Sequence, residues 1–355
     1  MENIKNHPAP NFHPLMKLKA DHFKSLMNWV KSYIADVYQI HCKFGLTGLQ
    51  EFNDKSFKLN LNGDTLSLLN FKGIFPNGLL ITLTENLTPV IKQSISIEED
   101  GIYDILLIID IDKFIFYGDI ENEGNQLRQP YYMNKARLEI VSHAEFNRYP
   151  YDSALKIGEL LIEENKYSLN EKFIPPCVYI GAYPRLFSKH AEYLKNWKEL
   201  LSYSIRIGRN NWAKRKNPII ESLCELNKGM GLFLNHKKID FQRLSPKGTP
   251  ESMVSLLKEL INGIIWHMET VSNSQELFDC FSSHMKYLVG HKVQHYHDIK
   301  KLLQDIIDYE FNLLQVNDAL EKIDTFWNCI IPIWRTISKI DDFIPTNTPG
   351  ISIQD

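Results

Sequence analysis

The residue pair best placed to do chemistry in this sequence is Asp110 and Asp112, at the end of an apolar run that begins at Ile105. Residues two apart on a strand face the same side, so these carboxylates could chelate a divalent cation and serve a metal-dependent transferase. The alternative is that a strand ends here and its acids are solvated beside Lys113. We favour the alternative and predict no metal site at this position.

The histidine cluster of the sequence consists of His291, His295 and His297. On a helix, His291 and His295 would share a face, whereas His297 would lie about 200° from His295. Three ligands therefore do not converge on a metal from one regular helix. A helix that begins near His297 is the interpretation that we favour.

Nucleotide and nucleophile motifs are absent from the sequence. Gly73 and Gly78 have the spacing of a phosphate-binding loop, but Leu79 and Leu80 follow where a lysine and a hydroxyl are needed. No GxSxG or HExxH pattern occurs, and no cysteine has a histidine partner that the spacing reveals. We therefore predict no catalytic residue, no cofactor and no enzymatic activity.

The charge balance argues against nucleic acid as a partner. Lys and Arg total 40 against 43 Asp and Glu, which gives a net charge of -3 and no electrostatic attraction to RNA, DNA or an anionic membrane. One short basic segment could touch RNA, although a solvated turn between two helices explains it better. This basic segment consists of Arg206, Arg209, Lys214, Arg215 and Lys216, with Trp212 among them.

Three features of the sequence predict a cytoplasmic, soluble protein. Residues 1–13 lack the apolar core of a signal peptide. No run of about 18 uncharged apolar residues occurs, so we expect no insertion into a membrane. The five cysteines are widely spaced and never form a CxxC pair, which is typical of free thiols in a reducing compartment.

The elements that must position these residues change character along the chain. Residues 14–38 have apolar side chains at three- and four-residue steps, which indicates an amphipathic helix. From about residue 43 to 140, short β-branched and aromatic runs alternate with turn signals such as Asn62-Gly63-Asp64, which predicts an antiparallel sandwich or barrel. Residues 131–141 are typical of a further strand, and residues 155–162 of a strand or a helix.

Beyond Pro176 the pattern is mostly helical, so the predicted fold class is α+β. Broad apolar stripes cover residues 186–201, 253–268 and 299–307, the last continuing less cleanly to Leu320, and Thr249 is expected to cap the second. Stripes this broad must be buried against other helices, either within the chain or between chains. The candidate residues for an interface between chains are Leu256, Leu260, Ile264, Leu303 and Ile307.

Several short segments follow one another in a fixed order along the chain. They are His22-Phe23, Phe44-Gly45-Leu46-Thr47-Gly48-Leu49, Gly73-Ile74-Phe75-Pro76-Asn77-Gly78 followed by Pro89, Phe173-Ile174-Pro175-Pro176-Cys177, and Tyr296-His297-Asp298. Asn77 and Gly78 suit a tight turn, Pro175 and Pro176 fix an extended exit from the sandwich, and Cys177 is expected to be a small buried apolar group. Taken in order, these segments resemble the TssK family, the baseplate subunit of type VI secretion systems, with Phe44 in place of the family's Trp.

The resemblance implies a homotrimeric, non-enzymatic adaptor at the inner-membrane-proximal baseplate. It implies a β-sandwich shoulder like that of phage receptor-binding proteins at residues 1–177, a helical neck at 178–312, and a short helical segment with a tail at 313–355. Family members hold the wedge proteins TssF and TssG by the shoulder and neck, and contact the membrane complex by a C-terminal head. A structural protein of a phage tail, or one that binds a receptor, shares this architecture and stays open as an alternative.

The family's head is expected to be absent or replaced here, because residues 313–355 follow a mostly helical pattern and end early. A divergent subtype with a different envelope anchor would follow. Phe326, Trp327 and Trp334 are candidate contacts for that anchor, although we favour ordinary packing against the neck.

Overall fold

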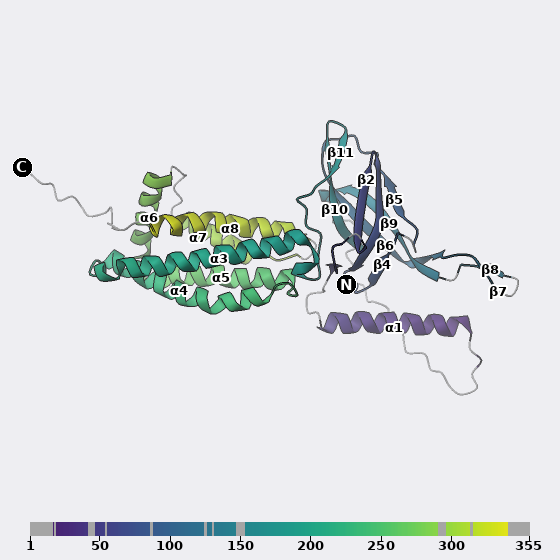
Figure 1. Cartoon of the computed structure of the whole chain (residues 1–355), viewed down its shortest axis with the longest axis horizontal. Coiled ribbons are helices and arrows are strands. Elements are labelled where there is room, and N and C mark those ends of the chain that lie inside the picture. The colour runs from purple at the N-terminus through teal and green to yellow at the C-terminus, as the bar shows by residue number, and fades with distance from the viewer. Residues whose placement is uncertain are drawn as a thin grey trace, which may run out of the picture. The chain divides into compact units, whose positions relative to one another are not determined.

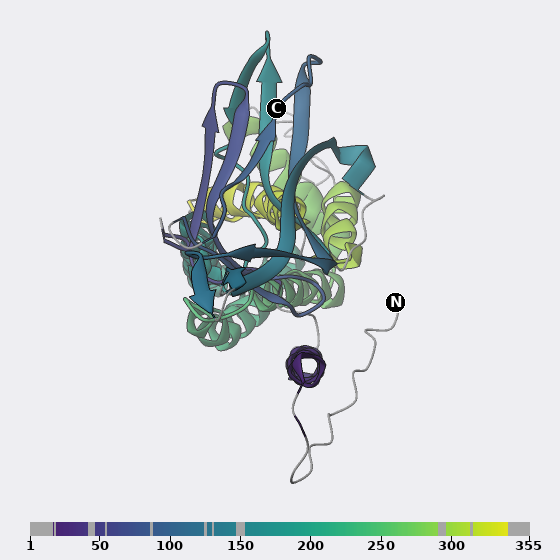
Figure 2. The ribbon, with the colours of Figure 1, turned by 90° about the vertical axis from the view of Figure 1, so that its right-hand side faces the viewer.

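The computed structural model describes residues 17, 19–41, 47–53, 55–85, 88–123, 126–129, 131–146, 153–289, 296–312 and 315–339. The chain divides into two compact units, Met1–Pro184 with Leu313–Gln315, and Arg185–Asn312 with Val316–Asp355. The first unit contains the helix α1 (Ala20–His41), viewed along its axis in Figure 2, and all of the strands. The second unit contains the helices α3 to α8.

The first sheet is organised around β3 (Thr65–Ile74), which pairs antiparallel with four other strands. These are β1 (Gly48–Leu49), β2 (Phe57–Asn62), β4 (Leu80–Leu83) and β5 (Ile91–Ser94). The turns lie where the sequence predicted them: Gly63 with φ 63° joins β2 to β3, and Gly78 with φ 81° lies between β3 and β4. In the second turn the Leu79 amide donates to Asn77 Oδ1 at 2.9 Å.

The second sheet has the strand order β11, β10, β6, β9. Its two longest strands, β6 (Gly101–Tyr117) and β9 (Tyr131–Ser142), lie side by side along their length (Figure 1). β10 (Ala154–Glu163) shows that the segment read as strand or helix is a strand, and β9 confirms the strand predicted at 131–141. The remaining elements of this unit are β7 (Glu121–Glu123), β8 (Gln126–Arg128), β11 (Lys166–Leu169) and the short helix α2 (His143–Phe146).

The core of the first unit lies between the two sheets. Residues 104–109 of β6 are all buried, although alternate side chains of a strand point to opposite faces, so this strand is covered on both sides. A Cβ added at Gly158 of β10 would lie 3.2 Å from Leu59 Cδ2 of β2, which places the two sheets in direct contact. Antiparallel sheets followed by helices confirm the predicted α+β class.

The helical unit consists of long amphipathic helices with clear start signals. Pro218 and Pro250 occupy first helical positions. Thr249 Oγ1 accepts a hydrogen bond from the Ser252 amide at 3.1 Å, which confirms the predicted cap. The helices are α3 (Pro184–Asn211), α4 (Pro218–Arg243), α5 (Pro250–Thr270), α6 (Ser274–Val289), α7 (Tyr296–Asp308) and α8 (Val316–Ile337).

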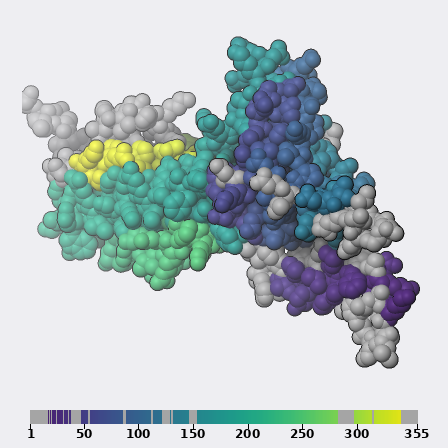
Figure 3. Space-filling view, turned by 45° about the vertical axis from the view of Figure 1, so that its right-hand side comes forward, coloured from purple at the N-terminus to yellow at the C-terminus, as the bar shows by residue number. Residues whose placement is uncertain are grey.

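Helix α3 runs antiparallel to α4 and also contacts α8. The Trp197 indole donates to the Leu234 carbonyl at 3.0 Å, and His190 Nε2 lies 3.0 Å from the Phe241 carbonyl. Because the later residue of α3 contacts the earlier residue of α4, the two helices are antiparallel. On the other side of α3, the Tyr193 hydroxyl donates to Asp324 of α8 at 2.9 Å. Figure 3 shows the teal surface of α3 beside the yellow surface of α8.

The bundle buries several residues that the sequence analysis named as candidates for an interface between chains. Leu260, Ile264 and Leu303 are fully buried within this single chain, so the expectation that they face sister chains was wrong. Leu256 and Ile307 are half-buried. The candidate anchor contacts are buried as well, because Phe326, Trp327 and Trp334 pack inside the bundle, as the favoured alternative had it.

Two boundaries of the helical unit differ from the expectation. The third stripe does not continue to Leu320, because α7 ends at Asp308 and Leu320 lies on α8. The expected tail, from residue 344, lies outside the described residues. None of the described helices combines the length and the hydropathy that crossing a bilayer requires.

Candidate functional site

Three family-like segments that are far apart in the sequence meet at β1. Gly48 and Leu49 pair with Ile74 and Gly73 of β3. The Leu49 amide donates to the Pro176 carbonyl at 2.8 Å, and the Val178 amide donates to the Leu49 carbonyl at 2.9 Å. We call this meeting of residues 47–49, 73–78 and 173–178 the motif junction. It ties the chain that leaves the sandwich to the edge of the first sheet.

The motif junction is too tight for a side chain at its centre. Gly48 has a φ of 112°, and a Cβ added there would lie 2.0 Å from the Pro176 carbonyl oxygen. A Cβ added at Gly73 would lie 2.7 Å from the Gly48 carbonyl oxygen. Glycine therefore has a steric reason at both positions, because the backbones of β1, β3 and residue 176 approach one another directly.

Cys177 lies in the motif junction with no exposed surface, as predicted. Its Sγ donates to the Pro175 carbonyl at 3.1 Å. Burial raises the pKa of this thiol far above its usual range, so the nucleophilic thiolate does not form. Cys177 therefore acts as a small packing group.

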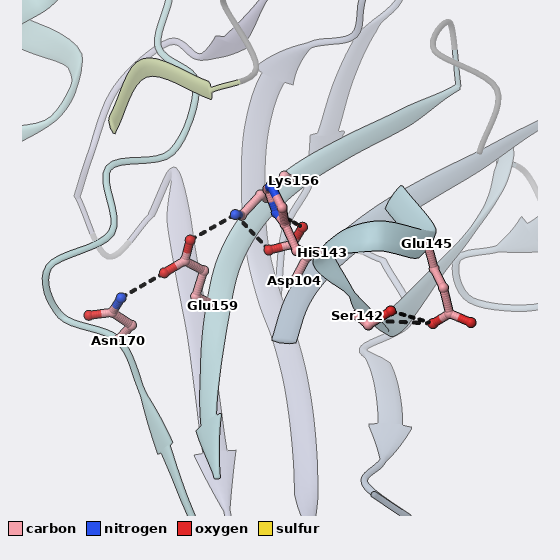
Figure 4. Close-up of polar contacts among 7 residues, drawn as sticks. All are labelled: Asp104, Ser142, His143, Glu145, Lys156, Glu159 and Asn170. Atoms are coloured by element: carbon pink, nitrogen blue, oxygen red, sulfur yellow. Dashed lines mark hydrogen bonds and ion pairs between the residues drawn. The ribbon is translucent and has the colours of Figure 1, made fainter. Parts of the chain in front are cut away.

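A buried charge network lies next to the motif junction (Figure 4). Asp104 of β6 and Glu159 of β10 are direct cross-strand partners, an arrangement in which two carboxylates repel. The register between β6 and β10 shifts between Lys156 and Gly158. This bulge lets Lys156 reach the same side as Glu159, although residues three apart on a regular strand face opposite sides.

Lys156 bridges both carboxylates. Its Nζ lies 2.6 Å from Asp104 Oδ1 and 2.7 Å from Glu159 Oε1, with 6% of the side chain exposed. His143 Nδ1 lies 3.1 Å from the other oxygen of Asp104, and Asn170 donates to Glu159 at 2.6 Å. We call these residues the Lys156 network.

The Lys156 network also contacts the family-like Phe173. The Lys156 Nζ lies 4.8 Å from the centre of the Phe173 ring, a cation–π distance. At the edge of the same region, Glu145 of α2 accepts hydrogen bonds from the amide and hydroxyl of Ser142, which fixes the start of α2 after β9. Since Asp104, Glu159 and Phe173 all belong to the first unit, the network positions the segment that enters the motif junction.

The structure gives no support to the metal-dependent alternative. Lys113 Nζ lies 2.8 Å from Asp110 Oδ2, and β6 continues through a register shift to Tyr117, so the strand does not end at Asp110 as we had expected. The Asp112 side chain lies outside the described residues. Across the described part of the chain, no group of three or more His, Cys, Asp or Glu residues is arranged to hold a metal.

Two other predicted features lie elsewhere in the fold. His291 and His295 are outside the described residues, and His297 is an exposed residue in the first turn of α7, as favoured. His22 Nδ1 accepts a hydrogen bond from the Lys19 amide at 3.1 Å near the start of α1. Gly45 is outside the described residues.

One face of α1 carries half-exposed apolar side chains, although the Tyr132 hydroxyl of β9 donates to Met27 Sδ at 3.0 Å. Phe23, Met27, Val30 and Ile34 follow one another at helical spacing and are each between 39% and 54% exposed. Monomeric proteins rarely expose a continuous apolar row, and such rows usually mark interaction surfaces. We call these four residues the α1 face.

A groove of about 590 Å³ lies between α3 and α4. Its lining includes apolar side chains of both helices, two glycines, and the cations Arg209 and Lys228. The basic segment predicted to be an inter-helix turn contributes Arg209 and Trp212 to the end of this groove. The prediction holds for residues 212–217, which connect α3 to α4, but was wrong for Arg206 and Arg209, which lie within α3. The motif junction and this groove are features of separate units.

The comparisons with known proteins identify the fold. No family model matches the sequence, and no curated protein is similar to it. Several solved structures are similar to this chain. One is TssK from the EAEC type VI secretion system bound to a nanobody, which has 14% identity and a TM-score of 0.53, over 88% of this chain and 99% of that chain. This chain has the fold of TssK.

Two solved assemblies contain chains with the same fold. The baseplate complex from the type VI secretion system has 14% identity and a TM-score of 0.58, over 91% of this chain and 99% of that chain. The TssK-TssF-TssG baseplate subcomplex has 16% identity and a TM-score of 0.52, over 92% and 99%. A crystal structure of TssK matches 94% of this chain but 70% of that chain, at a TM-score of 0.52.

Two structural features of this fold, the Lys156 network and the groove, were not predicted from the sequence. Lys156 lies between apolar residues at the start of β10, three residues before Glu159, and this opposite-charge pair was the available signal for the network. The cross-strand pairing of Asp104 with Glu159 had no sequence signal, because it depends on the register. The only sequence signal for the groove between α3 and α4 was the basic segment around Trp212, which did not by itself indicate a groove.

Proposed function

We propose that this chain is a structural subunit of a type VI secretion baseplate, where it links the wedge proteins TssF and TssG to an envelope-anchored complex. The observation that carries the proposal is the TssK-like fold, which extends over at least 88% of the chain and includes a match within a TssK-TssF-TssG subcomplex. The mechanism is binding through buried apolar surface, without turnover.

The motif junction supports this role by rigidity. Backbone contacts between β1, β3 and Pro176 fix where the chain leaves the sandwich, and the Lys156 network fixes the segment that precedes Pro176. A subunit that holds several partners needs such fixed geometry, because side chains that are already ordered cost less entropy on binding.

Homotrimer formation is part of the proposal, with the α1 face as the surface offered to sister chains. The stripe residues of α5 and α7 are already buried in the bundle, whereas Phe23, Met27, Val30 and Ile34 are exposed. Burial of exposed apolar side chains between copies would contribute about 25 cal/mol per Å² of apolar surface.

Co-purification tests the assignment to the baseplate. The tagged chain is co-expressed with the TssF and TssG homologues encoded in the same genome, and the complex is isolated at moderate salt. We expect all three proteins to elute together. If the chain elutes alone from every such co-expression, and its gene lies beside capsid and terminase genes, it belongs to a phage tail instead.

Light scattering on the eluted peak tests the trimer. We expect the mass of three chains at micromolar concentration, and a shift toward one chain when Phe23 and Ile34 are both replaced by glutamate. Ile239→Glu, at another half-exposed apolar helix position, is the matched control and should leave the mass unchanged. A stable monomer of the unmodified chain would rule out the trimer.

A further inference from the structure

Four glycines lie inside the described helices α3, α4 and α5, and two of them have a packing reason. A glycine within a helix lowers stability relative to alanine, so its presence calls for an explanation. A Cβ at Gly229 would lie 2.6 Å from the His267 ring, and one at Gly263 would lie 2.4 Å from the Phe233 ring. These two glycines allow α4 and α5 to approach closely.

The other two glycines have no such reason. A Cβ at Gly208 would meet no atom within 4 Å, and one at Gly231 would meet Ile205 at 4.0 Å, an ordinary contact distance. Both glycines line the groove between α3 and α4, one on each helix. Within the described residues, no side chain packs closely over either glycine.

A polar group in the same lining also lacks a partner. The Ser204 side chain is fully buried, and its Oγ has no hydrogen-bond partner in the described structure. A buried hydroxyl without a partner costs free energy, so native structures rarely contain one unless another molecule supplies the bond. Ser204 lines the groove one helical turn before Gly208.

The charge of the groove indicates the sign of the missing partner. Arg209 and Lys228 are the charged residues of its lining, and in the described part of the chain neither forms an ion pair. At one end, the Arg215 guanidinium lies 4.1 Å from the centre of the Trp212 ring, which holds a third cation beside the groove. Glu221 and Glu225 lie near Cys224 at this end, but neither is in the lining.

The dimensions of the groove suit a short helix. Its lining runs from Leu201 to Trp212 on α3, a distance of about 16 Å at the usual rise of about 1.5 Å per residue. The exposed apolar rim includes Ile205, Trp212 and Leu232. A three-turn helix is as long as the groove, and the missing side chains at Gly208 and Gly231 leave room for its apolar face.

We infer that the groove between α3 and α4 is a docking site for an acidic amphipathic helix of a partner protein. The apolar face of that helix packs over Gly208 and Gly231, and its carboxylates meet Arg209 and Lys228. This mode, in which a helix lies in a groove, uses apolar anchors spaced along one helix face. The inference rests on the proposed function as an assembly subunit and names the chemistry of one partner segment.

Fluorescence anisotropy on the full chain tests the inference with a defined probe. The probe is a labelled, lactam-bridged helical peptide of about 14 residues, with leucines along one face and glutamates on the other. A Cβ at position 208 meets no described atom within 4 Å, so Gly208→Leu, whose side chain extends into the groove, should keep or raise Tm while it weakens peptide binding by about tenfold or more. Equal binding to the Gly208→Leu variant and the unmodified chain, or no binding to either, overturns the inference.

The charge contribution is tested with matched reversals. Arg209→Glu with Lys228→Glu should abolish binding of the acidic peptide, whereas Lys195→Glu with Lys198→Glu, at exposed positions of α3 outside the lining, should leave it intact. A version of the peptide with lysine in place of glutamate should not bind the unmodified chain. Tighter binding of that lysine version, or equal losses in both reversal variants, overturns the charge assignment.

Two further outcomes separate the possible occupants. A change in the light-scattering mass of Gly208→Leu means that a second copy of this chain fills the groove, which overturns the partner assignment. If TssF and TssG co-purify but the peptide does not bind, the proposed function stands and this inference fails. If the peptide binds but no wedge protein co-purifies, the groove is supported as a helix-binding site and the baseplate assignment fails.

Discussion

Each unit of the molecule joins distant segments through a lysine held by carboxylates, and the two arrangements differ in burial. In the sandwich, Lys156 bridges Asp104 and Glu159 with 6% of its side chain and 2% of the Asp104 side chain exposed. In the bundle, Lys189 of α3 pairs with Asp324 of α8 at 2.9 Å, with 21% and 31% exposed. The same type of lysine–carboxylate ion pair therefore occurs in a site nearly closed to solvent and in a partly exposed one.

The difference in burial changes what each lysine does for the fold. Water competes for the charges of Lys189 and Asp324, so the strength of that pair is reduced by screening. If Lys156 is lost, the buried Asp104 carboxylate keeps only its contact with the His143 ring, and the like charge of Glu159 stays opposite it. The buried network therefore determines the geometry of the sandwich, whereas the bundle relies on apolar packing between its helices.

The largest effect in this comparison is expected for Lys156→Met. It leaves Asp104 buried and opposite Glu159, so the free energy of unfolding should fall by about 3–5 kcal/mol. Urea unfolding followed by circular dichroism measures this loss. Adding Asp104→Asn to Lys156→Met should recover part of it, because the unpaired charge disappears. If the double variant is less stable than the single one, the charge of Asp104 is not what makes the loss large.

A second comparison uses two helical glycines of the bundle, Gly263, which is packed against a side chain, and Gly208, which faces open space. Gly263→Ala places a methyl group 2.4 Å from the Phe233 ring and should lower stability by about 1–3 kcal/mol. Gly208→Ala enters open space and should raise stability by up to about 1 kcal/mol, since alanine favours the helix. Thermal unfolding of both variants gives the two signs. Losses of equal size would mean that α3 does not tolerate a side chain at 208 even without a neighbour.

How far the sequence predicted these features depends on whether the signal was local. The turn at Asn77-Gly78, the cap at Thr249 and the burial of Cys177 were predicted, because each depends on neighbouring residues or on residue type. The helical stripes were predicted as well, but not their burial partners. Leu260 and Phe326 are core residues because of how six helices pack, which periodicity does not encode.

The site was predicted in pieces. The segments around Gly48, Gly73 and Pro176 were recognised separately, but their convergence depends on strand pairing over more than a hundred residues. The Lys156 network depends on a bulge that changes the register by one residue, and the sequence has no marker for it. Sequence patterns specify elements, and the register decides which side chains meet.

A smaller effect is expected at the partly exposed lysine. Hydrogen bonds from Lys189 to Asp324 and Glu192 raise the pKa of Lys189 despite the opposing effect of its burial. Lys189→Met should nevertheless cost only about 1 kcal/mol, because the pair is partly solvated and screened. The loss should shrink further in high salt, where the loss in Lys156→Met stays nearly constant. A salt-independent loss as large as that of Lys156→Met would contradict the assignment of the difference to burial.

The smallest expected effect is a pH dependence that belongs to the bundle. Burial lowers the pKa of His190 and of His267, so both are held neutral in the folded state. The unfolded chain then binds more protons below the ordinary histidine pKa of about 6.5, and stability falls as the pH decreases from that value toward the folded pKa. Above that range these two residues add no pH dependence. Urea unfolding at a series of pH values measures the slope, and His190→Gln should reduce it without removing it, because His267 remains. An unchanged slope in that variant would assign the pH dependence to other groups. It would also contradict the claim that histidine burial in the bundle, rather than in the sandwich, sets the response of stability to mild acid.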